Sequence, residues 1–284
     1  MPKSREVFDY VKSRGWADLS GPESVLFLAA GEYNENYLLE TRDRGRCVFR
    51  INHGTQLGLD DQIGYEFRVL QAVYPSGATP EPYLVDSAGT ETFPNGVLLM
   101  RFLPGGAFAY EEDWRGAAGV FAAVHGVPVP DGLVVQADPV RAIAEESFEL
   151  VNRYPDHPRK RERDMILRYR DTVLNLADEA AELFGEDPLC VVNTEVNSGN
   201  FIVDREHDKV WLVDWEKAVV SSRFQDLGHF MVPTTTLWKS DFRFDGQGRK
   251  VFVAEYLRRA GISMSLNDAV FGADIMERTI LLRA

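Results

Sequence analysis

VVNTEVNSGNFIVDREHDKVWLVDWE, residues 191–216, is the stretch that decides the fold. It contains two short apolar runs, FIVD and VWLVDW, each of strand length. The polar run REHDK between them predicts a turn, so the two runs predict a β-hairpin. A second polar segment, NTEVNSGN, comes directly before the first strand and predicts a loop that leads into the hairpin.

Acidic and amide side chains stand where this backbone is expected to turn. Glu195, Asn197 and Asn200 lie in the loop, and Asp214 lies at the end of the second strand. Oxygen ligands of this kind suit a hard cation such as Mg²⁺, which proteins often share with substrate phosphates. An ordinary hairpin with a polar loop has the same pattern, so the stretch alone leaves both interpretations open.

Length and composition indicate a globular protein of two lobes. The chain has 284 residues, 45% of them hydrophobic and 26% charged, and this length fits two packed lobes better than one core. The net charge of −13 argues against a nucleic-acid partner, which requires a basic face. No apolar run approaches the length of a membrane span, and the N-terminus lacks the apolar core of a signal peptide.

Two cysteines, Cys47 and Cys190, lie in apolar runs. We therefore expect buried free thiols in a reducing, cytoplasmic compartment rather than a disulfide.

The first hundred residues predict a small antiparallel sheet. Strand-like runs at 25–31, 36–41 and 47–52 are separated by turn residues. The turn around Gly31 and Asn34 could bind phosphates through its backbone N–H groups, although it contains a single glycine and also reads as a plain hairpin turn.

One cation in this sheet has a candidate partner. Arg50 lies within an apolar strand, and such an arginine is either exposed at an edge or buried with an acid. Residues 60–74 predict a helix with Glu66 in its middle. The pair could orient a nucleotide's phosphates, whereas the simpler alternative is a surface glutamate.

A buried strand then leads into the second lobe. Residues 96–106 contain a continuous apolar run, VLLM (97–100), and end abruptly at Pro104-Gly105-Gly106, which is typical of a hinge. We therefore predict an N-terminal lobe over 1–103 and a helical C-terminal lobe over 104–284. The helices expected in the second lobe span residues 112–125, 138–153, 159–184, 223–232, 248–261 and 266–284.

Taken in order, these motifs resemble the aminoglycoside phosphotransferase and choline kinase-like family, a relative of the protein kinase fold. The resemblance extends from about Phe27 to the C-terminus. It is carried by GEYNENY (31–37), VFRIN (48–52), the helix with Glu66, LLMRFLPGG (98–106), FAAVHGVPVP (121–130), NTEVNSGNFIVD (193–204), VWLVDWEKA (210–218) and FQDLGHF (224–230).

The resemblance implies an α+β fold with two lobes and a role for each matched residue. It implies ATP or GTP and Mg²⁺ as cofactors, and a small-molecule hydroxyl as acceptor. The implied nucleotide-binding residues are Gly31, Asn34 and Asn36 in the phosphate loop, Arg50 with its partner Glu66, and Met100 and Phe102 in the linker beside the base. Asn200 and Asp214 match the metal ligands, Asp226 resembles an acid that braces the catalytic loop, and Glu216 matches an acid found in many members.

The catalytic loop departs from the family pattern. The family usually has His-Gly-Asp or His-Asn-Asp where this chain has Asn193-Thr194-Glu195, although the spacing from the acid to Asn200 is kept. In phosphoryl transfer this acid orients the acceptor hydroxyl and takes its proton. Glu195 is one methylene longer than aspartate, and a displacement of about 1 Å can cost roughly a hundredfold in rate.

Two functions therefore remain open, beside a third possibility of a non-kinase helical protein in which the hairpin is a coincidence. The first is a phosphotransferase that acts on a small-molecule hydroxyl, with Glu195 as catalytic base. The second is a catalytically impaired pseudokinase that binds a nucleotide or metabolite as a regulatory module. The sequence does not identify the acceptor substrate. A cationic acceptor is among the candidates because acidic residues such as Glu145 lie in the expected acceptor region. We expect a monomer or homodimer without a nucleic-acid or membrane partner.

Overall fold

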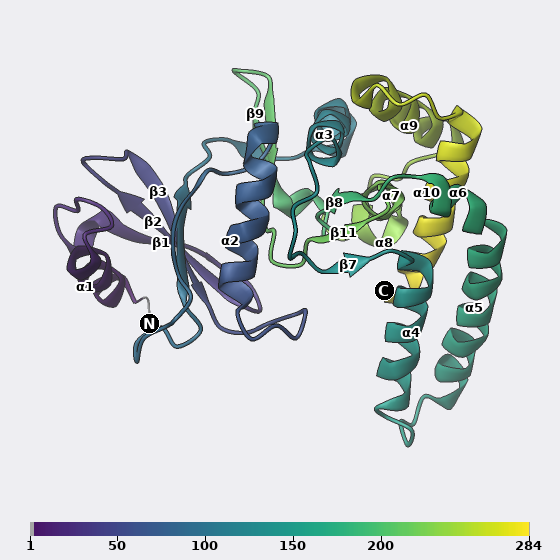
Figure 1. Cartoon of the computed structure of the whole chain (residues 1–284), viewed down its shortest axis with the longest axis horizontal. Coiled ribbons are helices and arrows are strands. Elements are labelled where there is room, and N and C mark those ends of the chain that lie inside the picture. The colour runs from purple at the N-terminus through teal and green to yellow at the C-terminus, as the bar shows by residue number, and fades with distance from the viewer. Residues whose placement is uncertain (1–2, 284) are drawn as a thin grey trace. The chain divides into compact units, whose positions relative to one another are not determined.

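The computed structural model describes residues 3–283, which form two compact units (Figure 1). The first unit comprises Met1–Pro104 together with Val213–Lys217, and the second comprises Gly105–Leu212 and Ala218–Ala284. The short segment Val213–Lys217 thus groups with the N-terminal unit, although in sequence it lies within the predicted C-terminal lobe. Asp214 and Glu216 belong to this segment, so the first unit holds two acids from the second half of the chain.

The first unit is built on an antiparallel sheet of five strands in the order β1-β2-β3-β5-β4. The antiparallel sheet predicted for this region is confirmed. Two helices accompany it, and α2 packs against β4 (Figure 1). The elements are α1 (Ser4–Arg14), β1 (Val25–Ala30), β2 (Asn34–Glu40), β3 (Arg46–Asn52), α2 (Gln62–Val73), β4 (Pro82–Asp86) and β5 (Val97–Arg101).

The centre of the sheet is apolar because β3 lies between two neighbours and is buried from Cys47 to Asn52. Tyr10 of α1 packs edge-on against Trp16, Phe49 and Phe93 at ring-centroid distances of 5.5, 5.8 and 5.3 Å. Burying four aromatic rings supplies much of the apolar area that stabilises this unit. This core fixes β3, and therefore Arg50, relative to the rest of the sheet.

The second unit is mainly helical, as predicted, but its described residues form further short strands besides the one predicted hairpin. A three-stranded sheet joins β6, β9 and β10, and another joins β7, β11 and β8. The elements are β6 (Gly106–Ala107), α3 (Tyr110–His125), β7 (Val135–Gln136), α4 (Pro139–Asn152), α5 (Lys160–Glu179), α6 (Ala181–Glu186), β8 (Cys190–Val192), β9 (Phe201–Asp204), β10 (Lys209–Leu212), β11 (Val219–Ser221), α7 (Phe224–Met231), α8 (Pro233–Thr236), α9 (Gly246–Ala260) and α10 (Leu266–Ile280).

Several predicted elements differ in extent from the observed ones, and some short strands were not predicted. The single helix expected over 159–184 is two helices, α5 and α6, because Ala180 leaves helical geometry at φ −98° and ψ 0°. The second strand of the hairpin ends at Leu212, and Asp214 adopts a left-handed conformation at φ 66°. The short strands β6, β7, β8 and β11 were not predicted, because a run of two or three residues is too short to show a periodicity.

Aromatic packing around α7 forms the core of the second unit. The Phe230 ring lies 5.5 Å from Phe121, 5.7 Å from Phe201 and 4.9 Å from Phe252. These partners come from α3, β9 and α9, so α7 is held on three sides. The packing matters for function because α7 also contains Asp226.

Two further expectations concern the whole chain. Cys47 and Cys190 are both buried free cysteines, as predicted. Within residues 3–283 no helix combines the length and the apolarity that crossing a bilayer requires.

Candidate functional site

In the first unit, one arginine is held by two acids. Arg50 Nη1 donates to the Glu66 carboxylate and, at 3.0 Å, to Asp214 Oδ1. Arg50 Nε donates to Asn36 Oδ1 at 3.0 Å. The side chains of Arg50 and Glu66 are 6% and 2% exposed. The predicted pairing of strand cation and helix acid is therefore present, and Asn36 fixes the guanidinium plane from β2.

Glu216, two residues past Asp214, connects three parts of the same unit. Its carboxylate accepts hydrogen bonds from Asn34 Nδ2 and, at 2.9 Å, from Gln56 Nε2. Its backbone carbonyl accepts from Gln62 Nε2 at 2.6 Å. The start of β2, the loop before α2 and the first residue of α2 are thus tied to the segment that carries Asp214.

Three carboxylates act on one guanidinium in this cluster. The charges of Glu66, Asp214 and Glu216 all favour the charged form of Arg50. Burial raises the pKa of Glu66 to about 7, and the neighbouring acids add to this effect while Arg50 opposes it. Burial by itself lowers the pKa of Arg50, but the surrounding carboxylates outweigh it and raise the pKa above its ordinary value.

The predicted nucleotide-binding residues fall into two groups. Gly31 is exposed in the β1–β2 turn, which is closed by a 2.9 Å bond from its N–H to the Asn34 carbonyl. Met100 is buried in β5, and Phe102 follows the strand. The Phe102 N–H donates to the Arg46 carbonyl at 3.2 Å, and the Arg46 guanidinium lies 4.5 Å from the Phe102 ring centroid.

In the second unit, Asp226 braces the loop that carries Glu195. Its Oδ2 accepts from the Asn193 N–H at 2.9 Å and its Oδ1 from the Thr194 N–H at 2.8 Å. Thr194 has φ 70°, a left-handed conformation that is costly for a β-branched residue. Because both amides next to this bend are bound by one carboxylate, Asp226 holds the strained turn in place directly before Glu195.

The rest of the loop is fixed by its own polar groups. The Glu195 carbonyl accepts from Asn197 N at 2.9 Å and from Asn200 Nδ2 at 2.7 Å. The Asn197 side chain accepts from Gly199 N at 2.9 Å and so begins the single 3₁₀ turn Ser198–Asn200. The Asn200 amide nitrogen is therefore occupied, and its oxygen is the atom that would serve as a metal ligand.

Two residues near this loop were missed by the sequence analysis. His125, in the last turn of α3, lies 3.2 Å from Asp226 Oδ2 through Nε2. Lys239 lies against the loop, because a Cβ added at Gly199 would meet Lys239 Nζ at 2.7 Å. Its neighbour Trp238 is 62% exposed. The motifs FAAVH and FQD could have suggested the contact of His125 with Asp226. The sequence contains no pattern that predicts the position of Lys239 beside the loop.

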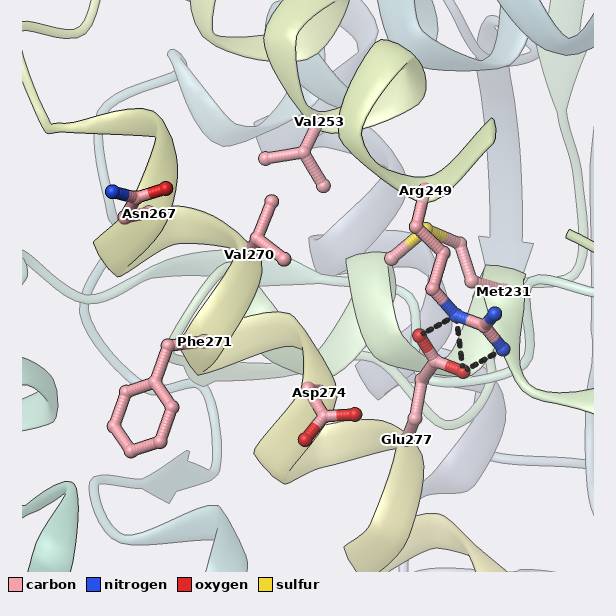
Figure 2. A pocket seen from close by; sticks show the side chains of 8 residues that line it. All are labelled: Met231, Arg249, Val253, Asn267, Val270, Phe271, Asp274 and Glu277. Carbon is pink, nitrogen blue, oxygen red and sulfur yellow. Dashed lines mark hydrogen bonds and ion pairs between the residues drawn. The ribbon is translucent and has the colours of Figure 1, made fainter. Parts of the chain in front are cut away.

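Figure 2 shows a separate pocket of about 300 Å³ between α7, α9 and α10. Arg249 and Glu277 form a two-pronged ion pair on one wall, with contacts of 2.8 to 3.1 Å. Val270 and Phe271 line the pocket from α10, the helix that also carries Glu277, and Val253 lines it from α9. None of the predicted site residues lines this pocket, so it does not belong to the arrangement described above.

Comparison with known proteins identifies the family. The family model described as the phosphotransferase enzyme family matches residues 24–266. The chain belongs to this family. Membership supports a phosphotransferase that acts on a small molecule, and it confirms the resemblance that the motifs predicted. A search of curated proteins finds no match.

Solved structures confirm the kinase-like α+β fold. An ethanolamine kinase from Plasmodium vivax is similar with a TM-score of 0.68 and 13% identity, over 92% of this chain and 76% of that one. A choline/ethanolamine kinase family protein from Mesorhizobium loti has a TM-score of 0.64 and 17% identity, over 97% and 84%. An aminoglycoside phosphotransferase solved with bound ADP has a TM-score of 0.61 and 12% identity, over 95% and 86%.

Proposed function

We propose that this protein is an ATP- and Mg²⁺-dependent phosphotransferase that phosphorylates a hydroxyl group of a small molecule. The observation that carries the proposal is the buried contact of Arg50 with Glu66 and Asp214. A cation buried at this depth needs acidic partners for stability. Glu66 is the buried partner, whereas Asp214 is 31% exposed, and a carboxylate so placed is suited to hold a second cation.

The donor set in the first unit fits Mg²⁺. Carboxylate oxygens are the ligands that this hard ion prefers, and Asp214 supplies one. We assign the ion to Asp214 and Asn200, the positions that the family resemblance implies. When bound, Mg²⁺ would offset the charge of the nucleotide phosphates.

The chain's own residues perform the remaining tasks. Arg50 binds phosphate oxygens, and Glu66 and Asn36 keep its guanidinium in one orientation. Glu195 accepts the proton of the acceptor hydroxyl as the new O–P bond forms, in the loop braced by Asp226. We further propose that the turn from Gly31 to Asn36 covers the phosphates, that the Met100–Phe102 linker lies beside the base, and that the protein is cytoplasmic, in keeping with its two free thiols.

Turnover is the direct test. Purified protein with Mg²⁺-ATP should release ADP with at least one member of a panel of hydroxyl and amine acceptors, and Asp214→Asn should abolish the release. Absence of turnover across the panel, slow ATP hydrolysis included, would contradict the proposal.

A pseudokinase is the second candidate, and the pair Asn193 and Glu195 favours it because both differ from the family's usual residues. Glu195→Asp separates the two functions. A large gain in turnover would indicate a lost base, whereas a loss would show that the pocket is built for glutamate. A melting temperature raised by Mg²⁺-ATP without turnover in either protein would favour the pseudokinase.

A further inference from the structure

The carboxylate that braces the catalytic loop has a third partner from another helix. Asp226 is completely buried, and its Oδ2 lies 3.2 Å from Nε2 of His125, in the last turn of α3. The same oxygen accepts the Asn193 N–H. The orientation of this carboxylate, and so the path of the loop, therefore depends on a side chain that is far from the loop in sequence.

His125 is in turn held from α9, which packs beside α3 (Figure 1). Its Nδ1 lies 2.9 Å from the hydroxyl of Tyr256, a residue with no exposed surface. Arg223 Nη1 donates to the same hydroxyl oxygen at 3.4 Å, and Arg223 Nε donates to Asp187 at 2.9 Å. A continuous buried chain of contacts thus runs from Asp187 to the catalytic loop.

Counting donors and acceptors fixes the direction of each bond. The Tyr256 oxygen accepts from Arg223, and among the contacts of the described residues its single O–H has an acceptor only at Nδ1 of His125. Nδ1 must then be the acceptor of the imidazole, and Nε2 must carry the proton that is donated to Asp226. A doubly protonated imidazole would point an N–H at the Tyr256 oxygen and leave the hydroxyl proton without the acceptor it has here.

We propose that His125 and Tyr256 are positioning residues of the catalytic loop. Tyr256 holds His125 in its neutral, Nε2-protonated tautomer, and His125 in turn fixes the Asp226 carboxylate that keeps Thr194 in its left-handed conformation. This chain of contacts therefore controls the orientation of Glu195, which directly follows the turn. The kinetic part of this inference rests on the proposed function, whereas the tautomer and the rigidity of the loop do not.

The tautomer and the loop amides can be measured by NMR without any substrate. Imidazole ¹⁵N spectra should show His125 protonated at Nε2 and not at Nδ1, with the signal assigned by its loss in His125→Gln. Tyr256→Phe should raise hydrogen exchange of the Asn193 and Thr194 amides by about tenfold, because the carboxylate that binds them is released. An Nδ1-protonated imidazole, or unchanged exchange at both amides, would overturn the proposal.

The kinetic readout separates positioning from simple packing. Tyr256→Phe should lower kcat by about tenfold with an unchanged KM for ATP, since misplacement of the base affects the chemical step. Tyr169→Phe is the matched control, because that hydroxyl donates to the Arg278 carbonyl at 2.8 Å on the surface of the same unit. His125→Gln keeps an N–H donor and should retain more of kcat than His125→Leu. Equal loss in these two variants, or a change in KM alone, would assign the pair to packing only.

An inactive wild-type protein would contradict the proposed function and leave this inference to the exchange and tautomer measurements. Normal activity with unaltered exchange in Tyr256→Phe would contradict this inference and leave the function standing.

Discussion

Arg50 donates through a single nitrogen, Nη1, to both Glu66 and Asp214. The two acids come from positions 148 residues apart (214 − 66), and Glu66 is almost fully buried whereas 31% of the Asp214 side chain is exposed. The more exposed acid can exchange its arginine for solvent or a ligand at lower cost than the buried one. Glu66 is therefore the structural partner of Arg50, and Asp214 is the partner that can be released.

This difference predicts unequal costs for removing either side of the ion pair. Arg50→Gln leaves the buried Glu66 without its cation and should destabilise the protein by about 3–5 kcal/mol. Glu66→Gln leaves Arg50 paired with Asp214 and should cost less, about 1–2 kcal/mol. Denaturant unfolding of both variants measures the difference. Equal costs would mean that Asp214 contributes nothing to holding Arg50.

Mg²⁺ should stabilise the protein even without a nucleotide, because an ion that binds Asp214 in the folded protein favours the folded state. A melting-temperature scan in about 10 mM MgCl₂ should show an upward shift relative to NaCl of the same ionic strength. Asp214→Asn should lose most of the shift, whereas Asp245→Asn, which alters a helix cap in the second unit, should keep it. A shift of equal size in Asp214→Asn would place the ion elsewhere.

The raised pKa of Glu66 predicts a specific pH dependence of stability. Because the folded protein holds this proton up to about pH 7 and the unfolded chain releases it near pH 4.5, the folded state binds more protons in between. Stability therefore falls as the pH rises through this window, with a slope of at most about 1.4 kcal/mol per pH unit. Unfolding in EDTA should show the slope in the wild type and a reduced one in Glu66→Gln.

Packing between α7 and α10 predicts opposite effects for two glycine-to-alanine changes. A Cβ at Gly228 would lie 2.6 Å from Met276 Cβ and 2.7 Å from the Glu277 backbone nitrogen, so Gly228→Ala should cost about 2–3 kcal/mol. Gly185, exposed in α6, has no atom within 4 Å of that position, and Gly185→Ala should stabilise by about 0.5–1 kcal/mol. Chemical denaturation measures both. A Gly228→Ala variant as stable as wild type would mean that α10 can move away from α7.

Elements with clear periodicity or strong breakers were predictable from the sequence. Strand β3, helix α2 and the break after Leu103 follow from apolar runs and from Pro104-Gly105-Gly106. The Arg50 and Glu66 pair was predictable because a charge inside an apolar strand needs a partner. By contrast, the tie from Asn34 to Glu216 joins residues 182 positions apart and leaves no local pattern. The same holds for His125, Tyr256 and Asp226, whose association depends on the packing of three helices.

The way Asp226 grips the catalytic loop has a consequence for how such a loop can evolve. Two of its bonds to the loop go to backbone N–H groups, those of Asn193 and Thr194. Neither bond involves the side chain of the residue that donates it. The backbone conformation of the turn therefore does not depend on the reactive side chains that the turn carries. In the course of evolution the reactive side chains of the loop can therefore be replaced one at a time without a change in the backbone. This chain is an example, because it has asparagine and glutamate where its family usually has histidine and aspartate.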